Sequence, residues 1–293
     1  MRWFPQKVQP IRSPDPRLEP TLGDIESHMP AGHPYRDSRH VTWAHETTHG
    51  LNARIRNQNV KVKQIAVGAG LGLTLSYPVP VDGVPFPELR LGRVNACYVL
   101  GGKAFVCEEP DLRLSQIAEA VPRSMRGMSY RLYLVEQQRY WEDCPLYVFD
   151  EWSAYANGLS TAIDANGGDG AFSDVLQMLE FTAYALVLAN KVTLLNKEGE
   201  NFYGFLKWMI ERCVKLYLQS KKIRELHNNS QVEYEHKILT APDFDDYREM
   251  TTFLYGAGWL QSLFNGDLPG PEPEPGPKPP DPEPEPDDPD IVW

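Results

Sequence analysis

The segment His45-Glu46-Thr47-Thr48-His49 combines the residue types of a zinc site with the spacing of one helical turn. On a helix, residues four apart lie on the same face, so His45 and His49 can both reach one tetrahedral Zn²⁺ at about 2.0–2.1 Å. Glu46 lies one step around the helix, where its carboxylate can accept a proton from water. Chance alone would produce this pattern on the order of 1% of the time, so we expect one zinc ion with Glu46 as a general base.

For both histidines to reach one metal ion, the residues around the motif must form a helix that packs one of its faces against the rest of the protein. Residues 38–57 contain no proline, and Asp37 or Ser38 can cap the first turn. The side chains on a different stripe from the two histidines are expected to bury the helix against the body; they are Ala44, Thr48, Leu51 and Ile55.

At these residues the chain resembles the zincin metallopeptidases, whose active-site helix carries H-E-x-x-H. The resemblance covers about 20 residues. It implies that His45 and His49 bind zinc and that Glu46 is the general base and proton shuttle. The metzincin branch requires Gly and His where this chain has Asn52 and Ile55, and an aspzincin G-T-x-x-D is absent. A gluzincin-like arrangement, with a glutamate from a later helix as third ligand, remains.

Glu151 is the candidate for that third ligand. It lies in a predicted helix over 145–165 among apolar neighbours, and a buried carboxylate needs a partner such as a metal ion. Tyr155, one turn further, occupies a position that often holds an acid orienting a ligand histidine in thermolysin-like enzymes, so its phenol is expected to take that role. Other side chains remain open as the third ligand: Asp150, Glu180, Glu108, Glu109 and His236.

Peptide hydrolysis also needs a hydrogen-bond donor for the oxyanion of the tetrahedral intermediate. The side chains that remain open as this donor are Tyr155, Tyr130, Tyr234 and His236. The sequence therefore favours a zinc-dependent metallopeptidase that acts on a peptide or protein. Two alternatives stay open: another zinc amide hydrolase, acting on a cell-wall peptide or a small amide, and a non-catalytic zinc protein with a structural role in an assembly.

The rest of the chain predicts an α+β body of the zincin-like type, with a small β-sheet and a helical majority. Residues 1–37 are expected to form an extended N-terminal arm, 38–266 the metallopeptidase domain, and 267–293 a disordered tail rich in proline and acids. One or two short strands are expected within 60–81, and a hairpin over 93–107 that turns at Gly101-Gly102. Helices are expected at 111–121, 126–141, 145–165, 171–195, 200–227 and 243–264, and a break within 200–227 is left open.

The net charge of −11 belongs mostly to the tail. Residues 267–293 hold nine acids against one base, so residues 1–266 carry a net charge of −3. Basic residues are scattered along the body, and we therefore expect no nucleic-acid partner. The tail is a spacer by composition, and its final Ile291-Val292-Trp293 provides a possible contact for a protein partner.

No stretch of the sequence resembles a secretory signal or a transmembrane helix. The longest apolar run, 181–189, is about half of the 20 residues that cross a bilayer. We expect a cytoplasmic protein by default, with non-classical release or association with a virus particle left open. The four cysteines show no C-x-x-C spacing and are expected to be free, although a hairpin could bring Cys97 and Cys107 together as a bridge.

Overall fold

The computed structural model describes residues 3–33, 36–59, 62–67, 73–78, 94–167, 172–193 and 200–267. Helices make up most of this part, and the strands form one three-stranded sheet and one two-stranded sheet. The predicted α+β class, with a small sheet and a helical majority, is confirmed in these coarse terms. The predicted tail lies outside the described residues from 268 onward. No helix in the described part is both long and apolar enough to cross a membrane.

The three-stranded sheet is antiparallel and has the order β1-β5-β4, with strands β1 (Trp3–Lys7), β4 (Val94–Tyr98) and β5 (Lys103–Glu108). Strands β4 and β5 form the predicted hairpin. Gly101 and Gly102 have φ values of 62° and 67°, a region in which glycine avoids the strain of a side chain, so the turn requires them. The predicted strands within 60–81 are also present, as the separate pair β2 (Val62–Val67) and β3 (Leu73–Pro78).

The register of the hairpin separates its two cysteines. Cys97 lies opposite Phe105, and Cys107 lies opposite Asn95, so the two thiols are diagonal neighbours rather than a direct pair. Both are buried and free. Because diagonal positions across a sheet are about 7–8 Å apart, they are too distant for the bridge that the sequence left open.

The N-terminal segment 1–37 is not only an extended arm, as the sequence predicted. Its strand β1 adds to β5, and residues 20–27 form helix α1 (Pro20–Ser27). Pro20 suits the first helical turn, and Leu22 and Ile25, three residues apart, are fully buried. Burial of these two side chains against the sheet and helix α2 makes the segment part of the body.

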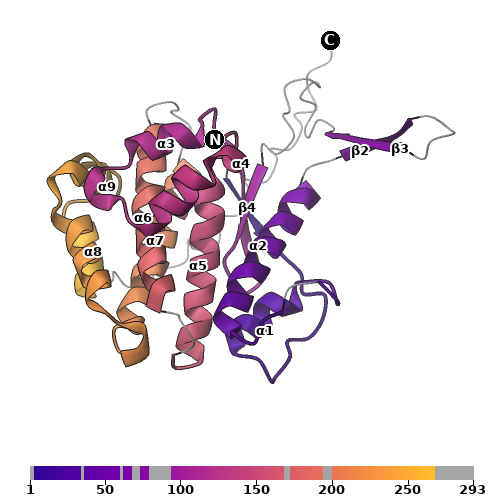
Figure 1. Cartoon of the computed structure of the whole chain (residues 1–293), viewed down its shortest axis with the longest axis horizontal. Helices are drawn as coiled ribbons and strands as arrows, with labels where there is room; N and C mark the ends of the chain where they lie inside the picture. Colours follow the sequence, from indigo (N-terminus) through magenta and orange to yellow (C-terminus); the bar gives the residue numbers. More distant parts are fainter. Residues whose placement is uncertain are drawn as a thin grey trace, which may run out of the picture.

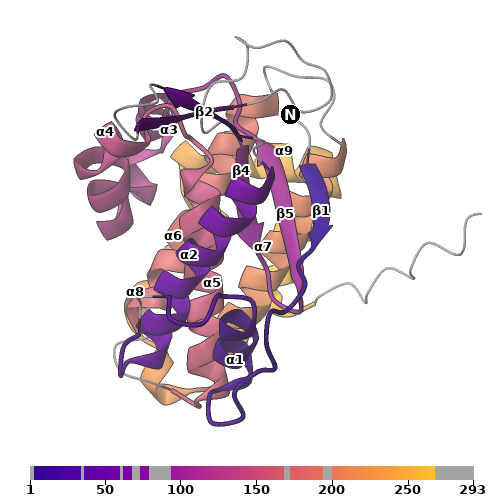
Figure 2. The same ribbon diagram turned by 90° about the vertical axis from the view of Figure 1, so that its right-hand side faces the viewer.

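Helix α5 (Tyr147–Asp164) is the central helix, because all but three of its 18 residues are buried. It contacts α2 (His40–Asn59), α6 (Phe172–Thr193), α7 (Glu200–Ser220) and strand β4. Figure 1 shows α5, α6 and α7 side by side, with α2 on the other side of α5 next to β4. In the view turned by 90°, α2 crosses in front of α5, and the sheet flanks them (Figure 2).

Most of the predicted helices are present, with three differences. Residues 126–141 form a π-helix, η2 (Tyr130–Glu136), followed by α4 (Gln138–Trp141), instead of one α-helix. The expected helix 243–264 is interrupted after Tyr255 and gives α9 (Asp245–Tyr255) and α10 (Trp259–Asn265). Helix α8 (Asn229–Thr240) was not predicted, although Asn228 and Gln231 form a capping box at its start. The remaining short elements are α3 (Leu114–Ala120), η1 (Arg123–Met125), η3 (Arg224–Leu226) and η4 (Pro242–Phe244).

Candidate metal centre

Helix α2 carries the H-E-x-x-H motif and has the two faces that the sequence predicted. The second stripe, formed by Ala44, Thr48, Leu51 and Ile55, is fully buried. Three of these side chains join a hydrophobic cluster with α1 and the sheet, which fixes the rotation of the helix about its axis. The face with His45 and His49 is thereby turned toward α5.

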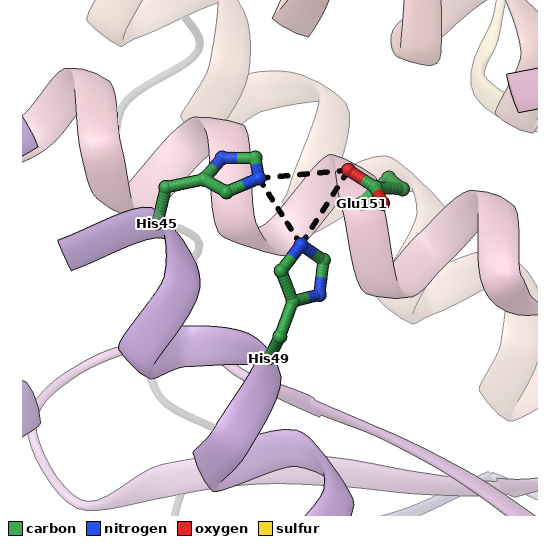
Figure 3. A group of neighbouring side chains, drawn as sticks. All are labelled: His45, His49 and Glu151. Carbon is green, nitrogen blue, oxygen red and sulfur yellow. Dashed lines mark hydrogen bonds and ion pairs between the residues drawn. The ribbon is translucent and has the colours of Figure 1, made fainter. Parts of the chain in front are cut away.

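Three side chains from α2 and α5 meet at one point, as Figure 3 shows. The Nε2 atoms of His45 and His49 are 3.1 Å apart. Glu151 Oε2 is 3.6 Å from His45 Nε2 and 3.5 Å from His49 Nε2. Ligand atoms bound to one tetrahedral zinc at 2.0–2.1 Å are separated by about 3.3–3.4 Å, so the three atoms fit the donor set of such an ion.

Glu151 is held so that one of its carboxylate oxygens faces the two histidines. The side chain is buried, and its Oε1 accepts a hydrogen bond from the hydroxyl of Tyr147. Its Oε2 is also buried, and it has no hydrogen-bond partner within the described part of the chain. Because a buried carboxylate oxygen without a partner is costly, a cation between Glu151 and the imidazoles would satisfy it. The residues present therefore fit zinc, and the role of Glu151 as its ligand remains a prediction.

Asp150 sets the orientation of His49. Its Oδ1 lies 2.9 Å from His49 Nδ1 and also accepts a hydrogen bond of 2.7 Å from the side-chain amide of Asn52. With Nδ1 donating to a carboxylate, Nε2 of His49 is left to face the other two donors. The sequence assigned this role to Tyr155; the structure corrects it to Asp150, which is adjacent to Glu151 on α5.

The two histidines have opposite electrostatic environments. Burial, followed by the charge of His49, lowers the pKa of His45 well below its usual value. Burial also acts to lower the pKa of His49, but the charges of Glu151 and Asp150 outweigh it and raise that pKa well above its usual value. The carboxylates thus concentrate negative potential at His49, as expected around a cation site.

Tyr155 lies beside the centre but contacts it through its ring. The ring centroid is 4.4 Å from that of His45, in an edge-on arrangement. Its hydroxyl oxygen lies 2.5 Å from the hydroxyl oxygen of Tyr133, which η2 supplies. Two hydroxyl groups that share one hydrogen bond leave one O–H proton for another acceptor. Tyr133 was not predicted from the sequence, because a π-helix sets its direction.

Glu46 lies on the exposed side of the same centre. It is exposed on α2, whereas His45 and Glu151 are buried. Burial raises the pKa of Tyr133, and the charges of Glu151 and Glu46 raise it further, so the Tyr133 hydroxyl is within electrostatic reach of both acids. A general-base candidate and a hydroxyl donor therefore lie near the same candidate metal position.

Apart from Asp150, which contacts His49, the rival ligands are exposed or bonded to other groups. Glu180 accepts a hydrogen bond of 2.8 Å from the backbone amide of Ser129, and Glu109 accepts one of 2.9 Å from the backbone amide of Leu146. Glu108 and His236 are exposed, on β5 and α8. Among the described residues, the group that could hold a metal ion is His45, His49 and Glu151.

The rival oxyanion donors are also engaged elsewhere. Tyr130 donates its hydroxyl to the carbonyl oxygen of Ala118, and Tyr234 donates to that of Met125. Burial raises the pKa of Tyr155, and the charges of Tyr133 and Glu151 act in the same direction. Tyr155 stays a prediction as the donor, and Tyr133 joins it, because either hydroxyl of this pair can donate to the other and one proton is left for another acceptor.

A separate surface hollow of about 560 Å³ lies against the N-terminal segment and does not include the three side chains. Its charged lining is paired internally: Arg12 contacts Glu26 at 2.5 Å, and Arg17 contacts Asp15 at 2.5 Å. Most of the charge that lines the hollow is therefore already paired, and Arg36 lies over the ring of Trp43.

Comparison of the chain with protein-family models, with curated proteins and with solved structures found no match.

Proposed function

We propose that the protein is a zinc-dependent metallopeptidase of the gluzincin type, acting on peptide or protein substrates. The observation that carries the proposal is the meeting of His45 Nε2, His49 Nε2 and Glu151 Oε2 at 3.1–3.6 Å. The exposed Glu46 beside this group, in an H-E-x-x-H helix, supports hydrolysis over a purely structural metal. A zincin-like fold is part of the proposal.

Each residue has a distinct role in the proposed reaction. Bound zinc would polarise the scissile carbonyl and acidify a water molecule. Glu46 accepts the proton of the attacking water and passes it to the leaving amine. The hydroxyl of Tyr133 donates a hydrogen bond to the oxyanion that develops on the carbonyl oxygen. Asp150 keeps the His49 ring in the tautomer whose Nε2 is free, and Tyr147 holds the Glu151 carboxylate.

Two measurements on the purified full chain test the proposal. Elemental analysis should find one zinc per chain, and a library of unstructured peptides should be cleaved. Glu46→Gln should keep the zinc and lower turnover by a factor of about 10²–10⁴, since it removes the general base. Glu119→Gln, which alters an exposed acid on α3, is the matched control and should leave turnover unchanged.

Each alternative function gives a different result. Cleavage of cell-wall fragments or small amides without cleavage of peptides would assign the site to another amide hydrolase. Stoichiometric zinc with equal turnover in wild type and Glu46→Gln would leave a non-catalytic zinc protein. Absence of zinc and of any zinc affinity would contradict all three functions.

A further inference from the structure

The two helices behind the candidate metal centre are rich in acids. Residues 140–190 include eight acids and no lysine, arginine or histidine. This stretch covers all of α5 and nearly all of α6, the two helices behind the centre. A divalent ion at the centre would offset the charges of Asp150 and Glu151, which both contact His49, and would leave Asp174 to pair with a positive charge of a substrate.

Asp174, in the first turn of α6, lies next to the face of α5 that begins with Glu151 at the candidate metal position. On α5, Glu151, Tyr155 and Gly158 follow one another at intervals of four and three residues, which places them on one face. A Cβ atom added to Gly158 would lie 3.4 Å from Asp174 Oδ2 and 3.6 Å from the Cβ of His45. Because Gly158 lacks a side chain, the carboxylate of Asp174 can occupy this space beside α2.

The carboxylate of Asp174 is partly buried and has no ion pair with a residue of the described part of the chain. Burial raises its pKa to about 7, and a hydrogen bond with Ser173 offsets only part of that effect. Among the described residues, no lysine or arginine contributes to this shift. The charge of Asp174 also helps to raise the pKa values of Tyr133 and Tyr155, so it is felt at the tyrosine pair beside the metal position. The side chain keeps partial contact with solvent, which leaves it open to a ligand.

We propose that Asp174 binds an organic cation of the substrate, an ammonium or guanidinium group near the scissile bond, and so selects basic peptides. This inference rests on the proposed function. Seven residues of helix separate Glu151 from Gly158, a rise of about 10 Å. An extended peptide advances about 3.3–3.6 Å per residue, so a lysine or arginine side chain one or two positions from the scissile bond spans this distance. A free N-terminal amine two or three residues away spans it as well.

A binding measurement tests the proposal without any turnover. The zinc-loaded Glu46→Gln protein is titrated with the capped peptide Gly-Gly-Arg-Gly-Gly and with the same peptide containing citrulline, the neutral analogue of arginine. The arginine peptide should bind at least about tenfold more tightly, as a hydrogen bond to a charged group predicts. Asp174→Asn in this background should abolish the difference. A second pair, tetraglycine with a free or an acetylated N-terminus, shows whether the cation is a side chain or the terminal amine.

The control is Asp246→Asn, which removes an exposed acid from the first turn of α9 and should leave the preference intact. Zinc content and circular dichroism of each variant verify that the site and the fold persist. The proposal would be overturned if the charged and neutral peptides bound equally, or if the preference for the charged peptide survived Asp174→Asn. It would also be overturned if none of the four peptides bound at millimolar concentration. A cation preference that depends on Asp174 in a protein without peptidase activity would refute the proposed function alone.

Discussion

Replacement of Asp150 tests the candidate metal centre through a residue that does not contact the metal. Its Oδ1 accepts hydrogen bonds from His49 Nδ1 and Asn52 Nδ2, at 2.9 and 2.7 Å. Asp150→Asn keeps an acceptor of the same shape but removes the charge, so zinc affinity should fall about tenfold. Asp150→Ala removes the acceptor as well, and the loss should approach a hundredfold, the usual range for residues that orient a ligand histidine.

The alanine variant should also be less stable. It leaves the Nδ1–H of His49 and one of the two N–H groups of the Asn52 amide without an acceptor, while the other N–H group still donates to Ser153 Oγ at 3.0 Å. Each unsatisfied buried donor costs about 1–3 kcal/mol. His49 keeps some contact with solvent, whereas Asn52 is fully buried, so the amide of Asn52 carries most of this penalty. We therefore expect a loss of about 2–4 kcal/mol in the free energy of unfolding for Asp150→Ala and a smaller loss for Asp150→Asn.

Zinc affinity is measured by competition with a chromophoric chelator, and stability by urea unfolding with zinc present and absent. The matched control is Asp143→Asn, which removes an exposed acid just before α5. Zinc affinity within twofold of wild type for Asp150→Ala would refute the assignment of Asp150 as the orienting residue. A loss of stability without loss of zinc affinity would show that Asp150 serves the fold and not the metal.

Three further variants probe the surroundings of the centre. Burial raises the pKa of Glu109 to about 8, so the unfolded chain loses this proton first and wild-type stability should fall as pH rises from about 4.5 to 8. In urea titrations, Glu109→Gln should remove the part of this dependence that Glu109 contributes and gain at most about 5 kcal/mol at pH 9. The part that comes from Asp174, whose pKa burial raises to about 7, should remain. Gly127→Ala would place a Cβ atom 1.9 Å from Glu180 Oε1 and so displace the carboxylate that accepts a hydrogen bond at the start of η2. The free energy of unfolding should fall by about 1–3 kcal/mol, and unchanged stability would argue against the contact between Gly127 and Glu180. Tyr133→Phe should retain zinc and lower kcat about a hundredfold at constant KM in steady-state assays, whereas an unchanged kcat would exclude it as the oxyanion donor.

The sequence predicted the parts of the site that depend on local spacing. The 3.6-residue period of a helix is enough to place His45 and His49 on one face of α2 and the packing residues on another. The burial of those packing residues confirms the predicted packing face. The hairpin β4–β5 was predictable because Gly101-Gly102 marks its turn. Glu151 stood out as an acid in an apolar helix, and the structure brings it to the two histidines.

The sequence did not predict features that depend on the direction of a side chain in three dimensions. Asp150 and Glu151 both looked like candidates for one position, whereas on α5 they point about 100° apart and reach different nitrogens of His49. Tyr133 is one of 14 tyrosines, and only the π-helical turn of η2 aims it at Tyr155. The N-terminal segment looked like an arm because its prolines hide the short apolar pattern of α1.

The composition of α5 is hard to explain by packing alone. A helix buried on nearly all sides gains most from apolar residues, and each acid placed in it costs free energy unless a partner compensates. Asp150 and Glu151 are both buried there, and their polar contacts converge on the ring of His49. Asp150 is satisfied by that ring and by Asn52, whereas Glu151 Oε2 points at two imidazole nitrogens and has no hydrogen-bond partner in the described part of the chain. An arrangement that pairs Asp150 with His49 and Asn52 and leaves Glu151 Oε2 facing two imidazole nitrogens is costly as a packing solution. A cation held by Glu151 and the two imidazoles would remove that cost, and Asp150 would then orient one of its ligands.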